Sequence, residues 1–200
     1  MKMIVLAAAA ALALEAAAAV AAPSVGSVAP EFTAVDSNGT SRSLADYRGK
    51  TVVLEWTNDG CPYVKKHYGA GNMQKLQQDV TEAGGVWLTL ISSAPGKQGF
   101  ADGARANELT ASRNAHPTAV LLDPVGAIGR AYEAQTTPHM FVIDQTGVLR
   151  YMGAIDDKPT SDPSSIASAR NYVREAFAAV SSGAAVAETA TEPYGCSVKY

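Results

Sequence analysis

The chain has two cysteines, and the first, Cys61, lies where an apolar stretch passes into a predicted helix. Residues 51–56 (TVVLEW) predict a buried strand, and Pro62 suits a first helical turn. A thiol at a helix N-terminus faces free backbone N–H groups and the positive end of the helix dipole, which favour the thiolate and lower its pKa. Because the thiolate attacks, Cys61 is the candidate nucleophile. The alternative is half of a purely structural disulfide.

The second cysteine, Cys196, lies near the C-terminus in PYGCSVKY. Two lone cysteines in an exported protein usually pair, and a tail over residues 181–200 is long enough to reach back to the first. We therefore predict that Cys196 resolves what Cys61 attacks; a free, inert tail thiol is the alternative. A bond closing so long a loop gives roughly 4–5 kcal/mol in the chain-entropy model, which suits a staple as well as a redox couple.

Other titratable residues add less. Lys65 follows Cys61 by one helical turn, so its charge is expected to favour the thiolate. His67 and His139 are more typical of surface histidines than of catalytic ones. The histidines and cysteines show no metal-ligand spacing, and no glycine-rich motif frames a phosphate, so we predict neither metal nor cofactor. A net charge of −3 argues against nucleic acid as a partner.

The N-terminus resembles an export signal. Residues 1–22 begin with Lys2, continue with an apolar stretch over 3–14, and contain Ala19-Val20-Ala21, which fits a cleavage site. The stretch is short for a membrane span, so we expect no stable membrane insertion after cleavage. The prediction is a periplasmic or secreted protein. The alternative is an alanine-rich helix on a cytoplasmic protein.

After cleavage the chain is long enough for one domain, which we place at residues 23–180, followed by a polar tail at 181–200. We expect an N-terminal hairpin around the turn at 37–40 and a closing hairpin around 144–147. Further strands are predicted at 51–56, 86–91 and 118–122, and helices at 62–68, 72–80, 103–115, 125–132 and 166–180. This alternation indicates an α/β domain: a central mixed sheet flanked by helices, with chemistry at the carboxyl ends of the parallel strands.

The order of a strand, a cysteine at a helix start, Thr137-Pro138 and then MFVIDQTGVLRYMG resembles the thioredoxin-like superfamily. Within it the chain is most similar to the redoxin branch, which includes peroxiredoxins of the AhpC/TSA type. The resemblance covers about residues 30–180. It implies a thioredoxin-like fold, with Pro138 in the cis form and its backbone facing Cys61. It also places Glu55 at the buried acid that relays protons in thioredoxin, where burial would raise its pKa. A glutamate exposed on a strand face is the alternative.

The sequence departs from both well-known members of this superfamily. Thioredoxins have two cysteines separated by two residues, and at the position of the second this chain has Val64. Peroxiredoxins carry their reactive cysteine at that same position, with a threonine and a proline before it, where this chain has Cys61 and Thr57. The arginine expected before the late strand is replaced by Thr136-Thr137-Pro138-His139. The resemblance is therefore to peroxiredoxin-like proteins with one motif cysteine and a further cysteine in the tail.

Together these features predict an exported thiol–disulfide redox protein. Its activity would be that of a thiol–disulfide oxidoreductase or a weak thiol-dependent peroxidase. Cys61 would attack a disulfide of a protein or small molecule, or a weakly activated oxidant, giving a mixed disulfide or a sulfenic acid. Cys196 would resolve that product, and an external thiol reductant would restore the enzyme. The rival is a redox-inert binding or structural module in which a bond between Cys61 and Cys196 pins the tail.

Overall fold

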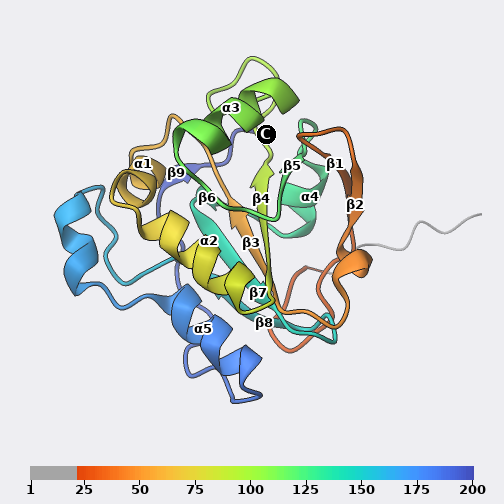
Figure 1. Cartoon of the computed structure of the whole chain (residues 1–200), viewed down its shortest axis with the longest axis vertical. Coiled ribbons are helices and arrows are strands. Elements are labelled where there is room, and N and C mark those ends of the chain that lie inside the picture. The colour runs from red at the N-terminus through yellow and green to blue at the C-terminus, as the bar shows by residue number, and fades with distance from the viewer. Residues whose placement is uncertain (1–21) are drawn as a thin grey trace, which may run out of the picture.

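The computed structural model describes residues 22–200. The predicted export signal therefore lies outside the described residues apart from Ala22. The main sheet has seven strands in the order β2-β1-β5-β4-β3-β7-β8 (Figure 1). Their bounds are β1 (Thr33–Asp36), β2 (Ser41–Ser43), β3 (Val52–Trp56), β4 (Val86–Ile91), β5 (Ala119–Leu122), β7 (His139–Ile143) and β8 (Leu149–Gly153). The helices are α1 (Pro62–Gly69), α2 (Asn72–Glu82), α3 (Gly103–Ser112), α4 (Ala127–Ala131) and α5 (Tyr172–Ser181).

The sheet is mixed, as the sequence predicted. Strands β3, β4 and β5 run parallel, while β7 and β8 on one side and β1 and β2 on the other pair antiparallel. Every residue of β3, β4 and β7 is buried, because these three strands have helices on one face and the N-terminal segment with α4 on the other. The carboxyl end of β3 is therefore held firmly at the centre of the sheet.

The alternation of side chains along β3 assigns each residue to one face of the sheet. Val53 packs in the core beneath α1, α2 and α5, and Glu55 lies on that same face. Leu54 and Trp56 pack in the opposite core, which includes Tyr132 after α4. Helix α1 therefore begins above the face that carries Glu55.

The last helix begins later than the sequence pattern predicted. Helix α5 starts at Tyr172 because Asn171 caps it, its side chain accepting a hydrogen bond from the Arg174 N–H. The preceding segment, Pro163–Ser168, forms a 3-10 helix, with Asp162 as its cap. A predicted single helix over 166–180 is thus two elements joined by extended backbone at Ala169.

The C-terminal tail packs against the domain. Strand β9 (Cys196–Ser197) pairs antiparallel with β6 (Thr136–Thr137) in a second, two-stranded sheet, which Figure 1 shows close to α1. Beyond it, the Val198 N–H donates to the Gln135 carbonyl at 3.0 Å, and the Tyr200 hydroxyl donates to the Ala134 carbonyl at 2.8 Å. The last five residues of the tail are therefore fixed by the segment before Pro138.

Candidate active site

Cys61 occupies the N-cap position of α1, directly after the loop that leaves β3. Pro62 is the first residue of the helix and lacks the N–H that would be unpaired there. The turn is closed by the Cys61 N–H, which donates to the Asn58 carbonyl at 3.1 Å. Cys61 thus lies at the carboxyl end of a central parallel strand, where the sequence placed it.

The structure brings Cys61, Cys196 and Thr137 together. Thr137 is the strand partner of Cys196, and its carbonyl accepts a hydrogen bond from the Cys61 thiol at 3.0 Å. Its hydroxyl donates to the Cys196 carbonyl at 3.4 Å. Both cysteines are free thiols in this structure. Residues 135 positions apart in the chain therefore meet across one short pair of strands.

The surroundings make the two thiols unequal. Burial raises the pKa of Cys61, but hydrogen bonds from the Cys196 thiol, from the backbone N–H groups of Val64 and Cys196 and from the Thr137 hydroxyl outweigh it, so the pKa of Cys61 is lowered. Burial and the neighbouring Cys61 raise the pKa of Cys196 to about 11. Of this pair, Cys61 therefore loses its proton more readily than Cys196 does.

Cys61 has no exposed surface. It belongs to the core that includes Val64 and Tyr68 of α1, and Cys196 and Tyr194 of the tail pack against that core. Reactive cysteines are normally partly exposed. The complete burial of Cys61 therefore differs from what is expected of a nucleophilic thiol. With the tail in place, the Cys196 thiol donates a hydrogen bond to the Cys61 sulfur.

Glu55 is fully buried and accepts hydrogen bonds from four side chains. Both its oxygens accept from the Tyr68 hydroxyl, at 2.9 and 3.1 Å, and Oε2 also accepts from Trp87 Nε1 at 2.9 Å. The remaining donors are Gln77 and Thr89. Burial raises the pKa of Glu55 while the bonds from Trp87 and Tyr68 oppose it. Among the described residues no hydrogen bond joins Glu55 to Cys61, so its role in proton transfer stays a prediction.

Two lysines follow Cys61 in α1, and it is Lys66, not Lys65, that contacts the tail. Lys65 is exposed, and within residues 22–200 its side chain forms no ion pair or hydrogen bond. Lys66 is buried, with Nζ 3.6 Å from Asp156 Oδ2 and 2.9 Å from the Lys158 carbonyl. The favourable charge expected from Lys65 therefore lies on the solvent side of α1.

A second buried polar cluster, formed by Lys66, His67, Asp156 and Tyr194, joins α1 to the tail. The Tyr194 hydroxyl donates to Asp156 Oδ1 and lies 3.3 Å from His67 Nε2. Burial lowers the pKa of His67 to about 4, with Asp156 opposing and Lys66 adding to the shift. Sequence reasoning missed this cluster because a Lys-His pair in a helix is typical of a solvent face. The only signal was Tyr194, two residues before Cys196.

The Thr137–Pro138 peptide bond is cis, as the resemblance implied. His139 follows it at the start of β7 and is buried, which lowers its pKa to about 4. Its Nδ1 accepts from the Gln135 N–H at 3.2 Å. His139 thus supports the backbone before Pro138, and no hydrogen bond in the described part of the chain links its side chain to either cysteine.

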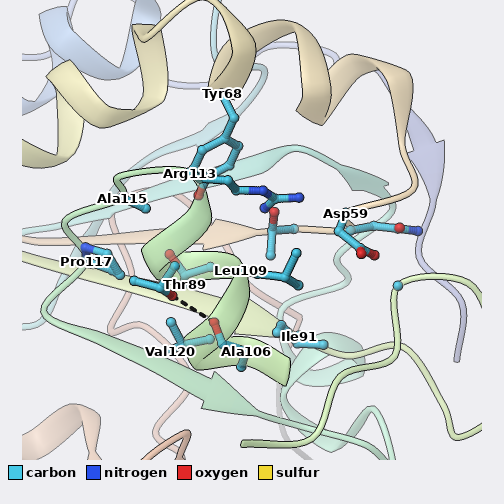
Figure 2. A pocket seen from close by; sticks show the side chains of 14 residues that line it. Asp59, Tyr68, Thr89, Ile91, Ala106, Leu109, Arg113, Ala115, Pro117 and Val120 are labelled. Atoms are coloured by element: carbon cyan, nitrogen blue, oxygen red, sulfur yellow. Dashed lines mark hydrogen bonds between the residues drawn. The ribbon is translucent and has the colours of Figure 1, made fainter. Parts of the chain in front are cut away.

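A separate pocket lies between α3 and the sheet (Figure 2). Its lining includes Tyr68 and Thr89, which bind Glu55, and Arg113, whose guanidinium lies 4.6 Å from the centre of the Tyr68 ring. The cavity volume is about 20 Å³, which is space for one water and too small for a substrate. Cys61 does not line it. The pocket therefore borders the buried acid and not the thiol pair.

The family model described as "AhpC/TSA family" matches residues 25–152. This chain belongs to the AhpC/TSA family. The match spans β1 to β8 and so includes Cys61 and Pro138, while Cys196 lies beyond it. The predicted resemblance to the redoxin branch is confirmed. No curated protein matches this AhpC/TSA-family chain.

Solved structures confirm the fold of this family member. A hypothetical protein from Sinorhizobium meliloti 1021 is 22% identical with a TM-score of 0.75, covering 88% of this chain and 94% of its own. An uncharacterized conserved protein from Geobacillus kaustophilus is 23% identical with a TM-score of 0.74, covering 88% and 92%. The thioredoxin domain of a thiol-disulfide oxidoreductase from Bacteroides vulgatus is 20% identical with a TM-score of 0.52, covering 72% and 96%. The thioredoxin-like α/β fold is thus confirmed.

Proposed function

We propose that this AhpC/TSA-family protein is an exported thiol–disulfide oxidoreductase, with Cys61 as nucleophile and Cys196 as resolving cysteine. One observation carries the proposal: β9 seats Cys196 opposite Thr137, whose carbonyl contacts the Cys61 thiol. The pKa of Cys61 is lowered and that of Cys196 is raised, which suits Cys61 to the role of nucleophile and Cys196 to that of resolving cysteine. Within residues 22–200, none of the helices has the length and hydropathy of a membrane span. The solved structures that this chain resembles include one titled a putative thiol:disulfide interchange protein, from Chlorobium tepidum.

The reaction follows from these roles. The Cys61 thiolate attacks a substrate disulfide, so that a Cys61–substrate bond forms, the substrate disulfide breaks, and one substrate thiolate leaves. Cys196 then gives up its proton and attacks the Cys61 sulfur; a Cys61–Cys196 bond forms and the second substrate thiol is released. An external dithiol reduces that bond and is itself oxidised. In the other direction the same steps oxidise a substrate dithiol.

The backbone supports each step. In the mixed disulfide Cys61 stays at the N-terminus of α1, where the Val64 N–H is directed at its sulfur. Thr137 pairs with Cys196, and its carbonyl contacts the Cys61 thiol, so a tail that pairs again with β6 returns Cys196 to the side of Cys61. A direct peroxidase step has less support, since Val64 stands at the position of the peroxidatic cysteine and is fully buried.

The complete burial of Cys61 favours one rival, a structural module whose tail is pinned by a permanent disulfide. Trapping separates the two. We expect Cys196→Ser protein to accumulate a mixed disulfide with a small disulfide such as 2-hydroxyethyl disulfide, attached at Cys61 by peptide mass mapping. Cys61→Ser protein, with Cys196 intact, is the matched control and should form little adduct because burial, which remains in this variant, raises the pKa of that thiol. Equal adduct on both variants, or none on either, would contradict the proposal.

A further inference from the structure

The tail covers Cys61 as an extended strand. Strand β9 pairs with β6 through backbone groups, and such groups are present in any extended peptide. Since Cys61 has no exposed surface under this strand, an outside disulfide reaches it only after the tail has moved. When the tail has moved away, the edge of β6 next to the Cys61 thiol is free to pair with another strand. The contacts that the tail makes at this edge then indicate which other peptide could bind there.

The position directly before Cys196 has room only for glycine. Gly195 has a φ of 143°, a conformation that L side chains rarely adopt. A Cβ there would lie 2.1 Å from the Thr137 carbonyl oxygen and 2.8 Å from its carbonyl carbon, both backbone atoms that cannot move aside. A peptide seated as the tail is seated must therefore have glycine directly before its cysteine.

The residue before that glycine occupies an aromatic site. The Tyr194 ring lies 5.7 Å from the Tyr63 ring, and Lys66 Nζ lies 5.5 Å from its centre. Its hydroxyl contacts Asp156 and His67 at the closed end. Lys66, His67 and Asp156 are 2% exposed or less, so this site is built of buried polar groups that need a partner. A phenol supplies both the apolar ring and the hydroxyl donor.

We propose that this face, formed by Tyr63, Lys66, His67, Asp156 and the β6 edge, is a binding site for an extended disulfide-bonded peptide carrying Tyr-Gly-Cys, with the tail as its resident occupant. The inference rests on the proposed function, because it names the substrate class of the same nucleophile. In the step it implies, the Cys61 sulfur bonds to the peptide cysteine, the peptide's disulfide breaks, and its other sulfur leaves as a thiolate that takes a proton from solvent. One disulfide is lost and one is formed.

The test uses full-length Cys196→Ser protein, in which the tail no longer competes chemically. The probes are the peptides Tyr-Gly-Cys-Ser-Val, Ala-Gly-Cys-Ser-Val and Tyr-Ala-Cys-Ser-Val, each with its cysteine capped as a disulfide with thionitrobenzoate, and capped cysteine alone. The rate of coloured thionitrobenzoate release and the mass of the Cys61 adduct are measured. We expect Tyr-Gly-Cys to react about tenfold faster than either altered peptide. Equal rates for all three peptides would overturn the inference.

The control probe separates this inference from the proposed function. If capped cysteine reacts at Cys61 while the peptides are not distinguished, the nucleophile stands and the peptide site falls. If no probe reacts, both fall. In wild-type protein, reaction confined to a covalent dimer through Cys61 and the Cys196 of a second copy would assign the site to the chain's own tail and overturn the peptide assignment.

Variants of the aromatic site sharpen the result. Tyr63→Leu, at the half-buried side of the site, should reduce the preference for Tyr-Gly-Cys over Ala-Gly-Cys, measured as the ratio of the two peptide rates in the same variant. Asp156→Asn should do the same by weakening the acceptor for the hydroxyl. Lys65→Ala, on the exposed face of the same helix, is the matched control and should keep the full preference. A preference unchanged in Tyr63→Leu and in Asp156→Asn would overturn the aromatic site.

Discussion

Two carboxylates are buried against helix α1, and they are held in different ways. Glu55 receives hydrogen bonds from four side chains, all supplied by α1, α2 and β4 of the domain itself. Asp156 receives one side-chain hydrogen bond from Tyr194 of the tail, and its Oδ2 has no hydrogen-bond partner among the described residues, with Lys66 at 3.6 Å. Glu55 is part of a closed scaffold, whereas Asp156 is completed by a segment that the proposed reaction moves.

The difference between the two carboxylates indicates that one buried cluster stabilises the domain and the other controls access to Cys61. The scaffold around Glu55 holds β3, β4 and α1 together beneath Cys61, so that damage there should unfold the protein. The cluster around Asp156 holds the tail, so that damage there should expose Cys61 while the domain stays folded. The predictions below test this division.

The largest effect is expected from Glu55→Ala. It leaves the donors of Tyr68, Gln77, Trp87 and Thr89 buried without their acceptor, which should lower the free energy of unfolding by about 3–5 kcal/mol. Denaturant unfolding measures it. Glu55→Gln keeps one acceptor oxygen and should lose less. A loss below about 1 kcal/mol in Glu55→Ala would remove the distinction between the two carboxylates.

Acid should weaken the Asp156 cluster through His67. The folded pKa of His67 is about 4, below its ordinary value of 6.5, so the unfolded chain binds the proton first. The stabilisation is therefore complete above pH 6.5 and is lost as the pH falls towards 4, by about 3 kcal/mol. Urea unfolding across this range measures it, and His67→Gln should flatten the curve. His139 adds a similar slope, which the His67 variant leaves in place. An unchanged curve in His67→Gln would contradict the assignment.

Removing the Tyr194 hydroxyl should have a smaller effect on the free energy of unfolding and a larger effect on the access of reagents to Cys61. Tyr194→Phe loses the bond to Asp156, at about 1–2 kcal/mol, and should speed alkylation of Cys61 in the Cys196→Ser background because the tail leaves more often. Tyr200→Phe is the matched control: it loses a hydroxyl bond to the Ala134 carbonyl farther along the same tail. Equal acceleration in both variants would show that Asp156 has no special part in holding the tail.

The smallest effect is expected at Lys65. Because its side chain is exposed and makes no contact with the thiol pair, Lys65→Ala should leave the pH midpoint of Cys61 alkylation unchanged. Thr137→Val, which removes a hydroxyl that favours the thiolate, should raise that midpoint. A clear rise in Lys65→Ala would restore the role that the sequence assigned to this lysine.

Local signals made much of the fold and half of the site predictable. Pro62 after an apolar strand located Cys61 at the start of α1, and the hairpin turns located the edges of the sheet. The pairing of β6 with β9 was beyond such signals, because each strand has two residues and their contact is between distant parts of the chain. The burial of Lys66 and His67 was equally hidden, since it depends on Asp156 and Tyr194 and on no periodicity within α1. The later start of α5 depended on the Asn171 cap.

The central claim is that Cys61 and Cys196 form a working redox couple. The most direct measurement is the reduction potential of their disulfide in the full chain, obtained by equilibration with thiol–disulfide buffers and quantified by mass spectrometry of the alkylated protein. We expect one two-electron transition with a potential above about −300 mV. A potential below that value would make the bond a structural staple, and a failure to form any Cys61–Cys196 disulfide would contradict the pairing itself.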